Sequence, residues 1–153
     1  MNALELKIPP PVVALLIAAA MWGISLATLS AEVSAPIRVV AAIAIALAGV
    51  GIAISGTIAF RRARTTVNPL KPQTTSSLVT SGVYRFTRNP MYVGLALRLL
   101  AWAAFLSSAL ALLGPLVFIL YISRFQIVPE ERVLSGMFGA AYSTYQAKVR
   151  RWL

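Results

Sequence analysis

Two chemically versatile residues are missing from this chain of 153 residues, which contains no cysteine and no histidine. Without cysteine there can be no disulfide, no catalytic thiolate and no cysteine-bound metal. Without histidine, the commonest general base and metal ligand is also absent. We therefore expect no metal site and no chemistry based on a thiol or an imidazole.

Charged residues are scarce, and acidic ones especially so. They make up 12% of the chain, with four acids against 14 lysines and arginines, while 59% of the residues are hydrophobic and the mean hydropathy is +0.80. Soluble domains carry roughly twice that charged fraction. A bilayer span needs about 20 mostly apolar residues, and the chain contains several such runs. The composition predicts an all-α polytopic membrane protein.

Four spans and one amphipathic helix account for the pattern of apolar runs. Uncharged runs predict spans over about 11–30 and 38–60. A longer stretch, broken only by Arg98, fits a helical hairpin with spans over about 90–106 and 109–126. The hairpin should turn near Ser107 and Ser108, or alternatively at Gly114 and Pro115. Small residues inside the second span favour close helix packing over a cofactor loop: Gly49, Gly51, Ala53 and Gly56.

Basic residues occur between and after the apolar runs, where they orient a membrane protein. The loop 61–89 carries many arginines and no acid, and the segment 128–153 ends in Lys148, Arg150 and Arg151. Both should lie in the cytoplasm, so both termini are cytoplasmic and the whole chain, 1–153, forms one membrane-embedded domain. We expect a bacterial-type inner-membrane protein with no nucleic-acid partner, despite the net charge of +10.

The last segment has the period of an amphipathic helix rather than of a span. Apolar residues recur at steps of three and four, with Tyr142 and Lys148 off that face: Leu134, Phe138, Ala141, Tyr145, Val149 and Trp152. One interpretation is a helix on the membrane surface, anchored at the headgroups by Trp152 and the terminal arginines. The other is a helix that closes over a site formed by the basic loop. The two are compatible.

Two polar clusters flank the third and fourth spans. Asn89 can cap a helix that begins at Pro90, although this does not explain the tyrosines and arginines around it. Glu130 and Glu131 are half of all the acids in the chain. Tyrosine faces and carboxylates together suit a ligand that is cationic and aromatic.

Three ordered motifs carry a resemblance to a known family. They are Leu78-Val-Thr-Ser-Gly-Val-Tyr84, Arg88-x-Pro-x-Tyr-x-Gly94 and Glu130-Glu-x-x-Leu-x-x-x-Phe-Gly-x-x-Tyr142. Over Ser76 to Trp152 the chain resembles the isoprenylcysteine carboxyl methyltransferases and their phospholipid methyltransferase relatives. The resemblance implies a membrane enzyme that uses S-adenosyl-L-methionine from the cytoplasm to methylate a lipophilic or lipid-anchored substrate from the bilayer.

The resemblance also implies roles for particular residues. Glu130 and Glu131 would lie at the catalytic centre, near cofactor and substrate. The residues that would hold the cofactor are Ser76, Ser77, Leu78, Val79, Tyr84, Arg88, Asn89, Pro90, Met91 and Tyr92. The activity most like that of the family is isoprenylcysteine carboxyl O-methylation. The alternatives are methylation of a phospholipid amine or a small thiol, and a membrane scaffold without enzyme activity.

Two positions depart from the family pattern. The family usually has histidine at the place of Asn89, which cannot titrate. The prenylcysteine enzymes have arginine at the place of Gln126, four residues before the first glutamate. We expect Gln126, Arg124 and Glu130 to contact substrate. Our hypothesis is that Arg124 or Arg98, an ionisable residue within a span, supplies the missing cation at the catalytic centre.

Overall fold

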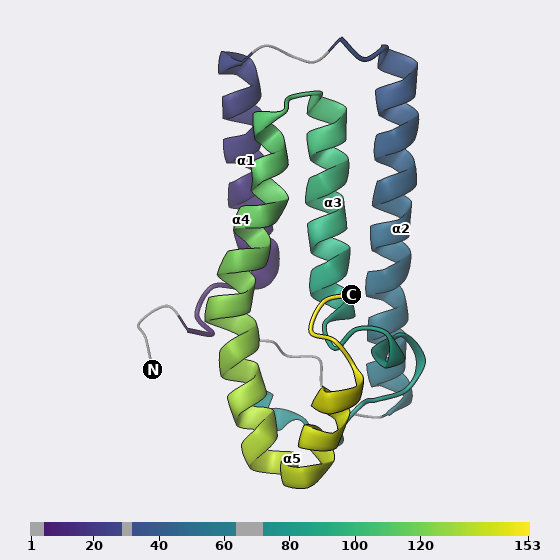
Figure 1. Ribbon diagram of the computed structural model, residues 1–153, viewed down its shortest axis with the longest axis vertical. Helices are drawn as coiled ribbons and strands as arrows, with labels where there is room; N and C mark the ends of the chain where they lie inside the picture. Colours follow the sequence, from purple (N-terminus) through teal and green to yellow (C-terminus); the bar gives the residue numbers. More distant parts are fainter. Residues whose placement is uncertain (1–4, 29–31, 64–71) are drawn as a thin grey trace.

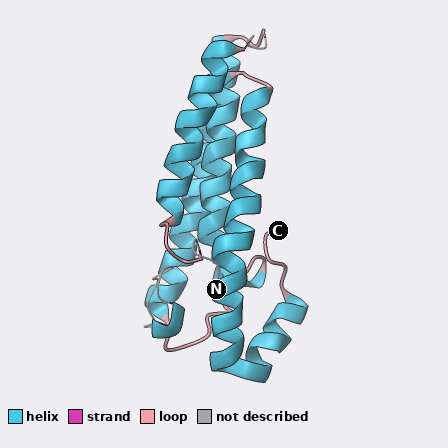
Figure 2. Cartoon of the chain, turned by 90° about the vertical axis from the view of Figure 1, so that its left-hand side faces the viewer, coloured by secondary structure: helices cyan, strands magenta, loops and turns pink. Residues whose placement is uncertain are grey.

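The computed structural model describes residues 5–28, 32–63 and 72–153, and these form helices and loops without a strand (Figures 1 and 2). Two helices, α1 (Pro10–Ala27) and α2 (Ala35–Arg62), and the continuous segment Leu110–Lys148 are long and apolar enough to cross a membrane. A shorter apolar helix, α3 (Pro90–Leu106), lies among them. The prediction of an all-α polytopic membrane protein is confirmed.

Some predicted segments fall partly outside the described residues. These are 29–30, at the end of the first predicted span, and 64–71, in the basic loop with Arg64 and Lys71.

The helices of the bundle turn large apolar side chains outward. Leu15 and Leu26 of α1 are 70% and 71% exposed, and Leu47 of α2 is 65% exposed. In water, so much exposed apolar surface would cause aggregation, whereas in a bilayer it contacts lipid. The long apolar face is therefore further evidence for a membrane environment.

Close packing of α2 against α3 depends on small residues. A Cβ atom on Gly94 would lie 2.6 Å from the carbonyl oxygen of Gly49 and 2.8 Å from the Cβ of Ala53. Gly56 lies similarly against Pro90, at the start of α3. The predicted packing role is confirmed for Gly49, Ala53 and Gly56. It is wrong for Gly51, whose Cβ would meet no atom within 4 Å.

The turn between the third and fourth predicted spans lies at Ser107 and Ser108, the first of the two predicted positions. Ser107 ends α3 in the left-handed conformation, with φ 52°. A 3-10 helix, Leu110–Leu112, follows and leads into α4 (Leu113–Ile122). Gly114 and Pro115 lie inside α4, where Gly114 packs against Met21 of α1.

The helix of the fourth predicted span continues beyond its apolar part without a break. A π-helical turn, Ser123–Ile127, joins α4 to α5 (Val128–Lys148). Charged residues begin at Arg124, so α5 extends past the apolar bundle. Gly139, at φ 49° and ψ −124°, kinks α5 and turns it back towards the bundle, and the tail 149–153 returns to the start of α3 (Figures 1 and 2).

Candidate functional site

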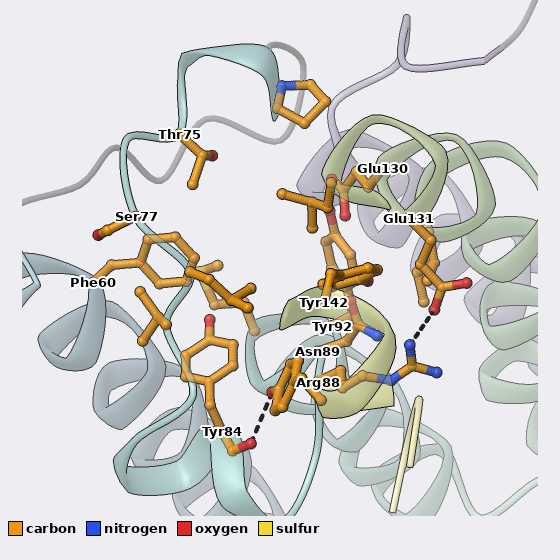
Figure 3. Close-up of a pocket in the computed structure, with 17 residues that line it drawn as sticks. Phe60, Thr75, Ser77, Tyr84, Arg88, Asn89, Tyr92, Glu130, Glu131 and Tyr142 are labelled. Atoms are coloured by element: carbon orange, nitrogen blue, oxygen red, sulfur yellow. Dashed lines mark hydrogen bonds and ion pairs between the residues drawn. The ribbon is translucent and has the colours of Figure 1, made fainter. Parts of the chain in front are cut away.

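A pocket opens at the end of the bundle where α2 ends, α3 begins and α5 folds back (Figure 3). Its walls combine four tyrosines, two glutamates and one arginine with apolar side chains. The lining residues are Phe60, Pro72, Thr75, Ser77, Leu78, Val79, Tyr84, Arg88, Asn89, Met91, Tyr92, Ile127, Glu130, Glu131, Leu134, Tyr142 and Tyr145.

One wall comes from the loop before α3. Gly82, at φ 63°, allows the chain to enter a 3-10 helix, Gly82–Arg85, which buries Tyr84 to 4% exposure. The Tyr84 ring packs edge-on against Phe60, with ring centres 5.3 Å apart. The Tyr145 hydroxyl donates to the carbonyl oxygen of Tyr84 at 2.8 Å. Burial raises the pKa of Tyr84, so this phenol stays neutral and presents an aromatic wall.

Glu130 accepts hydrogen bonds from two neighbours on a single oxygen. The Tyr92 hydroxyl donates to Oε1 at 2.6 Å, and Nε2 of Gln126 donates to the same atom at 3.3 Å. The π-helical turn places Gln126 behind the carboxylate, where it is 2% exposed. Burial outweighs both hydrogen bonds and raises the pKa of Glu130 to about 7. This carboxyl group can gain or lose a proton near neutral pH.

Glu131, in contrast, is bound by two arginines. Nη1 of Arg88 lies 3.0 Å from its Oε1, and Nη2 of Arg151 lies 2.6 Å from its Oε2 (the Arg88 pair is drawn in Figure 3). The side chains of Arg88 and Glu131 are only 11% and 13% exposed. Two guanidinium groups against one carboxylate leave an excess positive charge at this side of the pocket. Nε of Arg88 is buried and has no hydrogen-bond partner among the described residues.

The prediction that the Asn89 side chain caps α3 by a hydrogen bond is wrong. Asn89 does occupy the cap position, but its side chain makes no cap hydrogen bond. Instead Nδ2 donates at 2.8 Å to the carbonyl oxygen of Arg151, which the returning tail brings within reach. The backbone amide of Arg88 donates to the carbonyl oxygen of Arg150 at 3.0 Å. The tail is thus fastened to the start of α3.

The second interpretation of α5 agrees with the structure, because Leu134, Tyr142 and Tyr145 line the pocket. The tail does not simply anchor at headgroups, since Nε1 of Trp152 donates to Oγ of Ser123 at 3.0 Å. The placement of Tyr142 off the apolar face was wrong: Tyr142 is 3% exposed and Ala141 is exposed. The face instead continues from Phe138 by a step of four to Tyr142, and from there to Tyr145 and Val149, which pack in the same cluster.

Most of the residues expected to hold a cofactor come together in the pocket: Ser77, Leu78, Val79, Tyr84, Arg88, Asn89, Met91 and Tyr92. Two do not line it. Ser76 is exposed on the loop. Pro90 is buried against the site of Gly56, where it supports the packing of α2 and α3.

The two arginines expected to supply a cation lie elsewhere. Nη1 of Arg124 lies 2.9 Å from Oε1 of Glu5, a buried carboxylate whose pKa is lowered by Arg124 and then by Arg132. Arg98 is exposed on the side of α3 and lines a different hollow. It follows Tyr92 by six residues, which turns it about 120° away around the helix. Neither arginine reaches Glu130, and Gln126 supports Glu130 from behind without lining the pocket.

Sequence reasoning did not assign several of the lining residues to the site. Phe60 and Ile127 lie at the ends of spans and look like ordinary lipid-facing or core residues in the sequence. Pro72 and Thr75 belong to the loop, where no pattern distinguishes them. Leu134 and Tyr145 were on the predicted apolar face of α5, and that face was the available signal.

Comparison with known proteins gives the family. A 63-residue protein of Haemophilus influenzae, described as uncharacterized, is 52% identical to this chain over its whole length, which corresponds to 41% of this chain. No solved structure matches the chain. The family model described as phospholipid methyltransferase matches residues 37–141, which include most of α2, all of α3, both glutamates and most of α5. Since this match covers more than half of the sequence, the chain belongs to the phospholipid methyltransferase family.

Proposed function

We propose that this protein is an S-adenosyl-L-methionine-dependent methyltransferase that uses the pocket at the end of the bundle to methylate a lipophilic acceptor. One observation carries the proposal. Four tyrosines, a carboxyl group that titrates near neutrality and an arginine with a spare donor converge in one pocket beside the apolar spans. The family provides the reaction class, and the pocket provides a place for it.

The chemistry of the lining fits this cofactor. Tyrosine faces and a nearby carboxylate favour a sulfonium cation. The buried Nε of Arg88 can donate to a carboxylate such as that of the cofactor's amino-acid end. Leu78, Val79 and Phe60 offer an apolar surface for its aromatic base. The tail, fastened by Asn89, limits access of water from one side.

When bound, the cofactor would supply a methyl group that is already activated, so the protein has to orient the acceptor and manage charge. Glu130 can take the proton that an amine or a thiol gives up as its new bond to carbon forms. Tyr92 and Gln126 hold the carboxylate in place. Amine or thiol acceptors, including phospholipid amines, are therefore our first candidates, because Glu130 is available as a base and neither Arg98 nor Arg124 lies in the pocket.

Carboxyl O-methylation of an isoprenylcysteine is the second candidate. The motifs of the pocket loop and of Glu130 to Tyr142 resemble those of the prenylcysteine enzymes. A carboxylate acceptor needs no base, and it would depend on the excess positive charge around Arg88 and Arg151.

The orientation is part of the proposal. Helix α1 begins at the pocket end of the bundle and the tail ends there (Figure 1). The described basic residues of the loop 61–89 lie at the same end, namely Arg61, Arg62, Arg85 and Arg88. The positive-inside tendency supports a cytoplasmic location for this end of the bundle and its pocket.

Calorimetry on the purified full chain in detergent, with S-adenosyl-L-methionine as titrant, tests the cofactor. We expect saturable binding that Tyr92→Phe and Glu130→Gln each weaken by about tenfold, the effect of one charge-assisted hydrogen bond. Tyr121→Phe is the matched control, because Tyr121 lies outside the pocket and its hydroxyl has no partner among the described residues. Folded wild-type protein without saturable binding would overturn the proposal.

Methyl transfer from labelled cofactor separates the acceptors. Phosphatidylethanolamine, a simple lipophilic thiol and a prenylcysteine analogue should be compared side by side with wild type and Glu130→Gln. An amine or thiol acceptor predicts a loss of about a hundredfold in Glu130→Gln, because general bases contribute roughly 10²- to 10⁴-fold. Methylation of the prenylcysteine analogue with little loss in Glu130→Gln would instead support the second candidate.

A further inference from the structure

An arginine lies in an open, otherwise apolar groove on the side of the bundle, between α1 and α3. Arg98 is exposed in this groove. The residues around it are Ala14, Leu15 and Ala18 of α1 and Leu95, Leu99 and Trp102 of α3. None of these residues lines the pocket at the end of the bundle. The groove is therefore a second feature, which methyl transfer at the pocket does not use.

No acidic side chain of the protein neutralises Arg98. The sequence has four acids, all among the described residues. Glu5, Glu130 and Glu131 are bound by the arginine, tyrosine and glutamine side chains described above. Glu32 lies between α1 and α2, at the other end of the bundle. Within the described part of the chain Arg98 has no ion pair, so its charge in an apolar groove must be balanced from outside the protein.

The groove around Arg98 lies against the half of α1 that is nearer the pocket end of the bundle. Both α1 and α3 begin at the pocket end of the bundle (Figure 1). The groove extends down to Pro11, in the first turn of α1. Arg98 follows Pro90 by eight residues, or about 12 Å of helix. Helical side chains lean towards the helix N-terminus, so the guanidinium reaches back towards the membrane boundary.

The geometry points to a binding site for one phospholipid of the leaflet on the pocket side, with its phosphate at Arg98 and an acyl chain along Leu15, Leu95 and Leu99. An arginine offers parallel N–H donors that match two phosphate oxygens. The apolar walls of the groove run along the bundle, as an acyl chain does in a bilayer. A lipid without a phosphate would fill the walls and leave the arginine unbalanced.

Native mass spectrometry of the full chain in detergent tests this, with dioleoylphosphatidylglycerol as the probe and dioleoylglycerol as the same lipid without phosphate. We expect wild type to retain one phosphatidylglycerol and to lose dioleoylglycerol. Arg98→Gln should bind phosphatidylglycerol about tenfold more weakly, as for one charge-assisted hydrogen-bonded pair. Arg61→Gln, in the exposed last turn of α2, makes the same charge change and should bind like wild type.

Two more variants keep the test decisive if Arg98→Gln does not fold. Arg98→Lys keeps the charge but loses the paired donors, and should bind several-fold more weakly than wild type. Leu15→Trp leaves the charge unchanged and places bulk in the groove at a side chain that is 70% exposed, so it should also weaken binding. Equal retention of both lipids, or equal binding by the Arg98 variants, Leu15→Trp and Arg61→Gln, would overturn the site.

Discussion

The apolar part of the bundle and its polar end are held together by different means. Between α2 and α3, Gly94 approaches Gly49 so closely that an added Cβ would lie 2.6 Å from the Gly49 carbonyl oxygen. At the pocket end, hydrogen bonds and ion pairs fix Glu130, Glu131 and the returning tail. The difference follows from the surroundings. Lipid offers no hydrophobic drive for helix association, so close approach must stabilise the contact. At the water boundary, polar partners can define a site.

The close contact between α2 and α3 should be most sensitive to substitution at Gly94. In Gly94→Leu, even the first side-chain carbon would lie 2.6 Å from the carbonyl oxygen of Gly49, which cannot move without displacing α2. We expect a loss of more than about 3 kcal/mol, at the upper end for overpacking, and little folded protein. The yield of monodisperse protein and its thermal unfolding in detergent measure this.

Gly51→Leu is the matched control for Gly94→Leu, because a side chain at Gly51 meets no atom within 4 Å. Equal damage from both variants would contradict the specific contact and would indicate a general sensitivity of the spans to bulk.

At the polar end of the bundle, we expect stability to depend most strongly on Glu131, which pairs with Arg88 and Arg151. Glu131→Gln leaves two guanidinium groups facing each other without a carboxylate between them. Breaking a buried pair costs about 3–5 kcal/mol, and we expect about 3 kcal/mol because Arg151 is 38% exposed. Chemical unfolding of the detergent-solubilised protein measures it. Glu32→Gln, at an exposed position, is the control, and a similar loss there would contradict the role of the ion pairs.

The pH dependence of stability sharpens the contrast between the two glutamates. Burial raises the pKa of Glu130 to about 7 from 4.5, so the folded state binds this proton more tightly than the unfolded state. Its contribution to stability is complete below pH 4.5 and is lost as the pH rises to about 7. We expect wild type to lose about 3 kcal/mol over this window relative to Glu130→Gln, because one pKa unit corresponds to about 1.4 kcal/mol. No histidine titrates there to obscure the effect. Parallel stability curves for the two proteins would contradict a raised pKa.

The fold was largely accessible from the sequence, because lipid-facing helices leave a strong signal in composition. Uncharged runs predicted α1 and α2, and the small residues of the second span predicted close helix packing, for which the structure supplies α3 as the partner. Gly51 shows the limit of this reasoning. Gly49 and Gly51 are the same residue type in the same apolar run, and they differ only in the side of the helix on which they lie. The sequence does not reveal which side faces a partner helix.

The site was accessible only where motifs marked it. Tyr92 and Glu130 were recognised from the resemblance, and the structure joins them by a hydrogen bond. The pairing of Arg124 with Glu5 could not be foreseen, because 119 residues separate them and neither lies in a motif. Tyr142 was misplaced for a different reason: after Phe138, steps of three and four reach Ala141 and Tyr142, and the apolar period alone did not choose between them.

The smallest effect is expected for the hydrogen bond that fastens the tail 149–153 to the start of α3. Asn89→Ala removes the hydrogen bond to the Arg151 carbonyl while Arg151 can still pair with Glu131, so we expect a loss of about 1 kcal/mol. The local effect should be larger than the global one, with faster removal of residues 150–153 by carboxypeptidase. Thr144→Ala, which removes an exposed hydrogen bond to the Ala140 carbonyl, is the control. Asn89→His can restore a hydrogen-bond donor at this position. If the tail of Asn89→His again resists carboxypeptidase, the hydrogen bond to Arg151, rather than the amide group itself, is what holds the tail. Unchanged tail digestion in Asn89→Ala would mean that the ion pair of Arg151 alone holds the tail.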